Sequence, residues 1–335
     1  MNRAGRGCTL CRGKVKIQPE SEMRCEECKD TMRALFLAAA IAAPCIAVAA
    51  DGLGAITILE GKALVYRGGG RLHAIEGLRL AAGDIVETAP ATFAQLELVD
   101  RSVAQLGPAT RVMLNAAVSR QKTERWLYVM DGWVKIASVK SDPAAGPGFD
   151  VRAALFEIPA KPAVVVLRSS PAEVSLFVEV GASRIVERPQ GGGSAAVTVN
   201  LKAGDFYQRK PPARGVVAAG VAADFVGDMP RVFRDSLPLR LDRFGERQVQ
   251  AKDAPAFAYA DVAPWLQAEP AVRRPLMQRW RGKAREPAFR SALVANLAAH
   301  PEWDPILFPE KYKPKDPPPP PPAYPVGRAS SAAAP

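Results

Sequence analysis

Residues 126–137 read Trp-Leu-Tyr-Val-Met-Asp-Gly-Trp-Val-Lys-Ile-Ala, so that two runs of strand-forming residues flank one dipeptide, Asp131-Gly132. Aromatic and β-branched side chains dominate both runs, and such side chains favour extended backbone. An Asp-Gly pair accepts the positive φ angles of a two-residue turn, so the two runs are expected to pair with each other. The stretch therefore predicts a tight β-hairpin.

Short strands are also predicted on both sides of this hairpin, from Ile56 to about Lys210. Residues 94–98 alternate small or apolar with polar side chains, which is the period of a strand that has one face in water. The same period places two further sets of residues on single strand faces, namely Val174, Leu176, Val178 and Val180, and then Val197, Val199 and Leu201.

A short internal repeat accompanies these strands. Residues 80–85 read Leu-Ala-Ala-Gly-Asp-Ile, and residues 201–206 read Leu-Lys-Ala-Gly-Asp-Phe, while residues 130–134 are a looser version. Each copy joins the end of one strand to a glycine turn that begins the next strand. The repeat supports an antiparallel β architecture.

Beyond Pro230 the apolar residues follow helical spacing. Three trios recur at intervals of three or four residues, namely Val262, Trp265 and Leu266, then Val272, Leu276 and Trp280, then Phe289, Leu293 and Leu297. Four prolines are expected at or near helix starts, where a missing amide donor costs little, namely Pro264, Pro270, Pro275 and Pro287. We predict a small helical domain over residues 228–310, packed by its tryptophans and leucines.

Residues 32–50 resemble an export signal. One arginine precedes an apolar run that ends in small residues, and the run from Ala34 to Ala50 is shorter than the roughly 18 residues of a membrane-spanning helix. We therefore expect cleavage near Asp51 and a periplasmic or secreted protein without a stable transmembrane span. The alternative is an uncleaved anchor.

Upstream of this signal lie two Cys-x-x-Cys pairs, Cys8 with Cys11 and Cys25 with Cys28. Four thiolates at this spacing are typical of a structural zinc site. A signal peptide should begin the chain, so we expect that residues 1–31 lie upstream of the true start. All five cysteines, Cys45 included, then leave the mature chain, and no metal or other cofactor is expected in it. If the leader is translated, the four paired cysteines are the metal-ligand candidates.

The charge balance is basic, with a formal net charge of +11 over 335 residues. Residues 1–50 hold eight basic and five acidic residues, which leaves +8 for the mature chain. Six of the basic residues cluster on the predicted helices and are our interaction candidates, namely Arg273, Arg274, Arg279, Arg281, Lys283 and Arg285. They form either a solvated helix face or a surface for an anionic partner such as lipid headgroups or acidic polysaccharide. Export makes nucleic acid an unsuitable partner.

The order of several short motifs resembles the FecR domain family. The matching segments are residues 61–66, the Gly83-Asp84 turn followed by Glu87-Thr88, the strand that ends in Asp100-Arg101-Ser102, and the Leu106-Gly-Pro-Ala-Thr110 turn. The family usually has Asp-Gly-Ser where this chain has Asp100-Arg101-Ser102, so a wider turn is expected there. The resemblance covers about residues 55–140.

What the resemblance implies is a mainly β fold, a FecR-like β-sandwich or β-roll of short antiparallel strands. The helical spacing beyond Pro230 adds a small α-helical C-terminal domain to it. We divide the chain into a β domain (52–140), a second β region (146–212), the helical domain and a proline-rich tail (311–335). The family module relays signals in the cell envelope and is usually non-enzymatic. We expect this chain to lack the family's cytoplasmic anti-sigma arm.

Catalytic patterns do not assemble in the sequence. His300 lies beside Glu302 and Asp304, but one imidazole without a nucleophile or a second ligand is far from a working site. We therefore expect an exported, non-enzymatic interaction or regulatory module whose partner is an envelope protein. The alternatives are a structural protein that holds peptidoglycan or anionic lipid through its basic helices, and a carbohydrate hydrolase built from dispersed carboxylates.

Overall fold

The computed structural model describes residues 52–119, 122–139, 146–188, 196–245, 247 and 249–313. The described residues all belong to one compact unit. The predicted cysteine leader, with Cys8, Cys11, Cys25 and Cys28, lies outside the described residues. The export signal and all but the first residues of the proline-rich tail also lie outside them.

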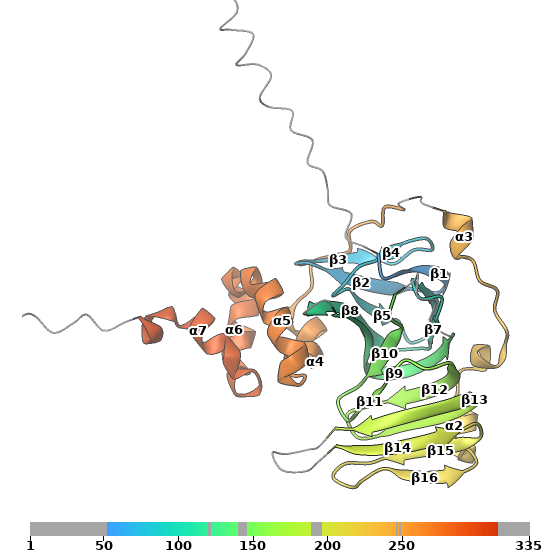
Figure 1. Ribbon diagram of the computed structural model, residues 1–335. Coiled ribbons are helices and arrows are strands. Elements are labelled where there is room, and N and C mark those ends of the chain that lie inside the picture. Colours follow the sequence, from blue (N-terminus) through green and yellow to red (C-terminus); the bar gives the residue numbers. More distant parts are fainter. Residues whose placement is uncertain are drawn as a thin grey trace, which may run out of the picture. The chain divides into compact units, whose positions relative to one another are not determined.

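The described chain is mainly β, as predicted, and its helices follow the strands (Figure 1). The strands are β1 (Gly54–Glu60), β2 (Ala63–Arg67), β3 (Gly70–His73), β4 (Arg79–Leu80), β5 (Ile85–Thr88), β6 (Phe93–Leu98), β7 (Val103–Leu106), β8 (Arg111–Ser119), β9 (Lys122–Ser138), β10 (Phe149–Arg152), β11 (Phe156–Ile158), β12 (Ala163–Ser169), β13 (Val174–Glu187), β14 (Val197–Lys202), β15 (Asp205–Arg209) and β16 (Val216–Ala219).

The strands form two sheets that share two long members. Sheet A runs β16-β15-β13-β12-β9-β7-β6-β1-β4, and sheet B runs β3-β2-β5-β8-β9-β10-β11-β13-β14. Neighbouring strands are antiparallel except β9 and β10, which are parallel. Because β9 and β13 belong to both sheets, the two sheets are continuous with each other.

The predicted hairpin at Asp131-Gly132 is wrong, because the chain does not reverse there. Asp131 still pairs with β8 in sheet B, whereas Gly132 pairs with Ser169 of β12 in sheet A. Gly132 has a φ of 97°, and a Cβ at this position would lie 2.4 Å from Thr110 Oγ1. Glycine therefore serves a bend that carries one continuous strand from sheet B into sheet A.

A second glycine does the same in β13. Residues Val174–Gly181 pair with β12 in sheet A, and residues from Ala182 onward pair with β14 in sheet B. Gly181 has a φ of 80°. A register shift before this bend leaves Glu179 without an opposite residue in β12. The predicted apolar face consequently holds for Val174, Leu176 and Val178 but fails at Val180, which is 58% exposed.

The repeated Gly-Asp turn is confirmed at both of its close copies. Gly83 and Gly204 have φ angles of 84° and 91°. In each copy the aspartate side chain accepts a hydrogen bond from the backbone N–H three residues earlier, at 2.8 Å for Asp84 and 2.9 Å for Asp205. The turn geometry therefore recurs because the same side chain closes the same loop.

The turn at Asp100 is tight, because the Arg101 N–H donates to the Leu98 carbonyl at 2.9 Å. Arg101 itself adopts a φ of 67°. The Asp100 carboxylate accepts hydrogen bonds from the backbone N–H and the hydroxyl of Ser102, at 3.0 and 2.8 Å. The expectation of a wider turn was therefore wrong, because an arginine adopts the left-handed conformation at this position.

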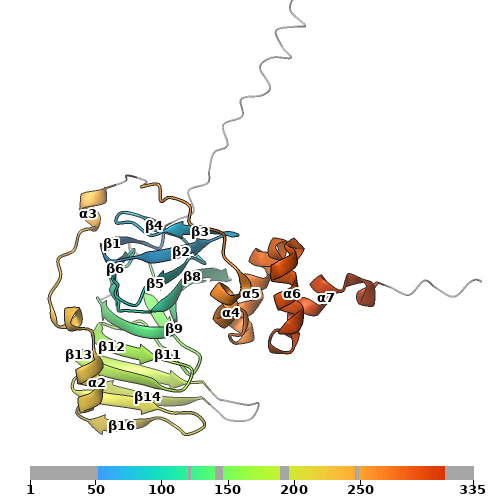
Figure 2. The ribbon, with the colours of Figure 1, turned by 180° about the vertical axis from the view of Figure 1, so that it is seen from behind.

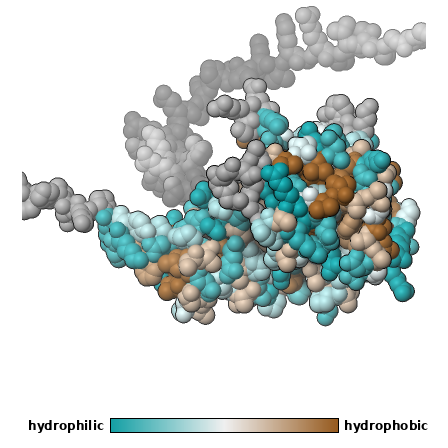
Figure 3. All heavy atoms as spheres, turned by 90° about the horizontal axis from the view of Figure 1, so that it is seen from below, coloured by the Kyte–Doolittle hydropathy of each residue, from teal (hydrophilic) through white to brown (hydrophobic). Residues whose placement is uncertain are grey.

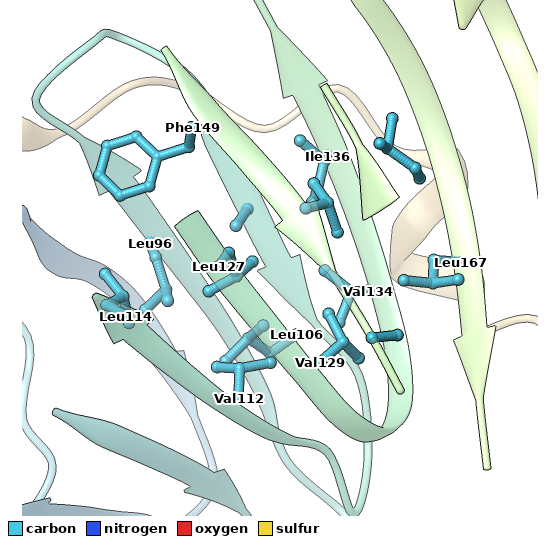
Figure 4. Packing of buried hydrophobic residues seen from close by; sticks show 14 of the residues in the cluster. Leu96, Leu106, Val112, Leu114, Leu127, Val129, Val134, Ile136, Phe149 and Leu167 are labelled. Atoms are coloured by element: carbon cyan, nitrogen blue, oxygen red, sulfur yellow. The ribbon is translucent and has the colours of Figure 1, made fainter. Parts of the chain in front are cut away.

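The main core lies between the two sheets (Figure 4). Sheet A contributes residues such as Leu96 and Ile136, and sheet B contributes residues such as Val112 and Leu127. Alternate residues on the same strands face outward. Met113 of β8, for example, belongs to a second cluster on the outer face of sheet B.

The outer face of sheet A is covered by an irregular segment, residues 221–245, which we call the strap. It contains the short helices α2 (Ala223–Asp228), η2 (Arg231–Arg234) and α3 (Leu241–Phe244). Phe225 and Phe233 of the strap pack with Trp133 and Phe206 of the sheet. The prediction that residues 94–98 have one face in water is wrong for this reason, since all of them are buried.

The outer face of sheet B is covered by a helical bundle, residues 257–312. Its elements are α4 (Tyr259–Leu266), α5 (Pro270–Trp280), η3 (Arg281–Arg285), α6 (Pro287–Ala295), η4 (Leu297–Ala299), η5 (Pro301–Trp303), α7 (Asp304–Leu307) and η6 (Pro309–Tyr312). Figure 2 shows this bundle on one side of the sheets and α2 and α3 on the other. In the described part of the chain no helix is long and apolar enough to span a bilayer.

The predicted helical trios form the core of the bundle. The members of the first two trios are all at most 5% exposed, and in the third trio Phe289 and Leu293 are buried while Leu297 is partly buried. Pro270 and Pro287 begin helices, as predicted. Pro264 and Pro275 instead lie inside α4 and α5. Packing of the apolar face outweighs the lost backbone hydrogen bond at these two positions.

Polar contacts fasten the edge of the bundle to sheet B. Trp280 Nε1 donates to the Gly68 carbonyl at 3.1 Å, and Tyr128 Oη donates to the Glu269 carboxylate at 2.6 Å. The Arg279 guanidinium donates to the Gly83 carbonyl. Burial lowers the pKa of Arg279, and the nearby Asp84 opposes this shift.

Candidate cleft between the two sheets

An open cleft of about 560 Å³ lies where β9 passes from sheet B to sheet A. Four segments that are far apart in the sequence meet there: the end of β5, the turn before β8, the bend of β9 and the end of β12. The lining residues are Glu87, Thr88, Pro90, Pro108, Ala109, Arg111, Asp131, Gly132, Trp133, Arg168, Ser169, Ser170 and Pro171.

The floor of the cleft is built by the turn motifs of the β domain. The Thr88 hydroxyl donates to the Gly107 carbonyl at 2.7 Å and accepts from the Thr110 N–H at 2.8 Å. The Thr110 hydroxyl accepts from the Trp133 N–H at 3.0 Å. These bonds hold the turn before β8 against the bend of β9, so the position of the cleft depends on Gly132.

One end of the cleft carries an arginine between two carboxylates. Arg111 Nη1 lies 3.0 Å from Asp131 Oδ2, and Arg111 Nε lies 3.5 Å from Glu87 Oε1. Glu87 also accepts hydrogen bonds from Tyr66 Oη at 3.1 Å and from Trp265 Nε1 of the bundle at 3.0 Å. Glu87 therefore belongs both to the cleft and to the contact between sheet B and the bundle.

Burial dominates the electrostatics of this end. It raises the pKa of Glu87 against the opposing effects of the Trp265 hydrogen bond and Arg111. Burial also raises the pKa of Asp131, which Arg111 opposes. It raises the pKa of Tyr66 to about 12, and the charge of Glu87 adds to that shift. Tyr66 is therefore a neutral donor to Glu87 at physiological pH.

The other wall of the cleft belongs to the end of β12. Arg168 lies over the Trp133 ring at 5.2 Å and forms an ion pair with Asp228 of the strap at 2.9 Å. The side chains of this pair are 46% and 59% exposed, so solvent screens it strongly. The Ser169 and Ser170 hydroxyls are bonded to the carbonyls of Met130 and Glu173.

The cleft is suited to binding an anionic ligand. The side chains of its arginines, Arg111 and Arg168, are 37% and 46% exposed, whereas those of Glu87 and Asp131 are 13% and 24% exposed. An incoming group therefore meets guanidinium donors before it meets carboxylates. Guanidinium groups bind carboxylates through paired donors.

The six predicted interaction residues divide into two sets. Arg273 is bonded to Glu302 at 2.9–3.1 Å, Arg279 is bonded to Gly83, and Lys283 pairs with Glu286 at 2.9 Å and lies over the Phe257 ring. These three make contacts within the domain. Arg274, Arg281 and Arg285 are exposed, although Arg274 Nε lies 3.7 Å from Glu302.

His300 lies in the core of the bundle, where its Nε2 is 3.0 Å from Tyr259 Oη. Burial lowers its pKa. Across the described ranges, no group of three or more His, Cys, Asp or Glu side chains is placed to hold a metal ion.

Reasoning from the sequence did not find the cleft. Arg111 and Arg168 were not singled out, and Asp131 was assigned to a turn. The one available signal was that Glu87-Thr88 and residues 106–110 belong to the motifs that resemble the FecR domain family, and both segments line the cleft.

Comparisons with known proteins give a weak structural similarity. No family model matches the chain, and no curated protein matches it. Two crystal structures, at 2.50 and 1.65 Å resolution, of a "putative anti-sigma factor" from Parabacteroides distasonis ATCC 8503 are similar to this chain with a TM-score of 0.33 and 12% sequence identity. The similarity covers 41% of this chain and 59% of each of those chains, so this chain spans well under two thirds of their length.

Proposed function

We propose that the chain is an exported, non-enzymatic interaction module of the cell envelope, and that its cleft binds an acidic segment of a partner protein. The exposure of Arg111 and Arg168 at the cleft carries this proposal. A carboxylate of the partner replaces the solvent-exposed Asp228 beside Arg168, which costs little because that pair is screened by water. The resemblance of the cleft motifs to the FecR domain family supports an envelope location.

The binding role is favoured over hydrolysis by the state of the two carboxylates. A glycosidase needs one carboxylic acid that protonates the leaving group and a second carboxylate on the other side of the scissile bond. Here Glu87 and Asp131 lie on either side of Arg111, and Glu87 is further bonded to Tyr66 and Trp265. Both carboxylates are therefore committed to holding the arginine and the bundle.

A photo-crosslinking amino acid at Ala109, on the exposed rim of the cleft, tests the proposal in the intact envelope of the host. We expect a specific protein adduct that disappears when Arg168→Glu is added. The matched control carries the probe at Val118, which is 77% exposed and lies on β8 outside the cleft lining. Equal adducts at both positions, or glycan as the captured material, would contradict the proposal, and turnover of wall fragments would support the hydrolase instead.

A second candidate role uses the exposed arginines of the bundle. Arg281 and Arg285 are the first and last residues of η3, and both are exposed. We propose that these two side chains hold an anionic lipid surface. The double variant Arg281→Ala with Arg285→Ala should then reduce sedimentation with phosphatidylglycerol vesicles and leave sedimentation with phosphatidylcholine vesicles unchanged. Unaltered binding to both vesicle types would remove this candidate.

A further inference from the structure

β16 is an uncovered end of sheet A. It pairs with β15 on one side, and among the described strands it has no neighbour on the other side. All four of its residues are exposed, with Val216 at 68% and Val217 at 43%. Figure 3 views the molecule from the end at which Figure 1 places β16, and hydrophobic side chains are gathered on that surface.

Two other edges of the described sheets, at β3 and β14, are protected. At β3 the chain covers its own edge, because the His73 N–H donates to the Lys252 carbonyl and the Ala254 N–H donates to the Arg71 carbonyl. The edge strand β14 alternates between partly buried and exposed residues, and its exposed positions are the polar Thr198, Asn200 and Lys202. Charged and polar residues, prolines and covering segments are the usual protections of a sheet edge.

Within the part of the chain that the structure describes, β16 has none of these protections. Its sequence, Val-Val-Ala-Ala between Gly215 and Gly220, holds no charge and no proline. An apolar edge with free backbone groups is a template for a further strand, which gains main-chain hydrogen bonds and side-chain contacts on both faces. A tail of this chain is a poor occupant, because its six consecutive prolines, 317–322, lack the N–H groups that pairing needs.

The charges at the two ends of β16 are complementary to each other. Arg214 is exposed just before the strand, and Asp224 is exposed in the first turn of α2 just after it. If two copies of β16 pair in antiparallel fashion with Ala218 at the centre, residue 214 of one copy lies opposite residue 222 of the other. Arg214 then approaches Asp224 of the second copy at both ends of the pair.

We propose that a second copy of this chain adds to sheet A through β16, so that the two sheets A become one continuous antiparallel sheet across a two-fold axis. The arrangement is self-complementary, since the same strand serves both copies. A four-residue strand pair is small compared with the roughly 1,000 Å² of a stable interface, so the dimer forms reversibly as concentration rises. This association is independent of the cleft and of its partner.

Sedimentation velocity over a wide concentration range tests the proposal on the full chain as its host processes it. We expect a monomer at low concentration and a dimer at high concentration. Val217→Lys should abolish the dimer, because it places two like charges as diagonal neighbours across the centre of the pair. The matched control is Val118→Lys, which also adds a lysine at an exposed strand valine and should leave the dimer unchanged.

A charge swap provides the sharper arm of the experiment. Arg214→Asp and Asp224→Lys should each weaken the dimer, and the two together should restore it. Since all three altered positions are exposed, circular dichroism should show unchanged folding. A wild-type chain that stays monomeric at the highest concentration overturns the proposal. So does a dimer that survives Val217→Lys, because it would use another surface.

Discussion

The two outer faces of the sandwich are covered by segments of different construction. The bundle on sheet B brings three fully buried tryptophans and regular helices, whereas the strap on sheet A has short helical turns and two buried phenylalanines. The bundle is therefore held chiefly by apolar burial. The strap depends more on a few hydrogen bonds to buried polar groups of the sheet. The two covers should respond differently to substitution.

The largest effect is expected in the bundle. Trp280 is fully buried and donates to the Gly68 carbonyl. Trp280→Ala should lower the free energy of unfolding by about 3–5 kcal/mol, since it removes a large aromatic side chain from a packed cluster. Urea denaturation measures this loss. Val294→Ala, at a 41% exposed position of α6, is the control and should change stability by no more than about 0.5 kcal/mol.

The second largest loss of stability is expected at the bend of β9, which joins the two sheets. Gly132→Ala forces a positive φ on a residue with a Cβ and also drives that atom against Thr110. The strain alone costs about 1–3 kcal/mol. Gly204→Ala is the matched control, because its φ of 91° is similar but no atom lies within 4 Å of the added Cβ. If both variants lose the same stability in urea, crowding at Thr110 does not matter and the account of the bend is wrong.

A smaller loss of stability is expected in the strap, and local proteolysis measures it. The Glu97 carboxylate accepts from the N–H groups of Arg240 at 2.7 Å and Leu241 at 3.1 Å, at the start of α3. In Glu97→Gln an amide NH2 group replaces one carboxylate oxygen and faces a backbone N–H, so one hydrogen bond is lost. Loss of a hydrogen bond to a charged group lowers stability by about 1.5–3 kcal/mol. Trypsin should cut faster after Arg240 and Arg243. Glu60→Gln, at an exposed position of β1, should leave the cutting rate unchanged.

The difference between the two covers also decides what could be predicted from the sequence. The bundle was predictable because its apolar face repeats every three or four residues, so neighbours in the chain reveal it. The strap was not, because Glu97 and Arg240 are 143 residues apart and neither residue looks unusual alone. Alternating residues 94–98 indicated a strand correctly, but its polar face could not be assigned to water without knowing what covers it.

The same reasoning applies to the cleft and to the bend of β9. Local turn chemistry favoured a reversal at Asp131-Gly132, but pairing of Gly132 with Ser169 in another sheet prevailed. Arg111, Asp131 and Arg168 meet only because β9 changes sheets there. No spacing rule joins residues from three strands, so the site depends on a tertiary feature that the dipeptide did not reveal.

The smallest predicted effect is the pH dependence that Glu87 contributes at the contact between sheet B and the bundle. Burial raises its pKa in the folded state above the ordinary value of a glutamate. The folded protein therefore binds this proton at a pH where the unfolded chain has released it, and stability falls as the pH rises through that window.

In Glu87→Gln this titration is absent, so the stability of the wild type relative to the variant should decline from about pH 4 upward, through the ordinary glutamate pKa. Asp131 is present in both proteins, and its charge adds to the raised pKa of Glu87, so the comparison measures Glu87 together with its coupling to Asp131. Urea midpoints of the two proteins across the pH range give the difference directly. A difference that grows in favour of the wild type with rising pH would show that Trp265 and Arg111 stabilise the ionised carboxylate more than burial destabilises it. A constant difference would show that these effects cancel, and either result contradicts the prediction.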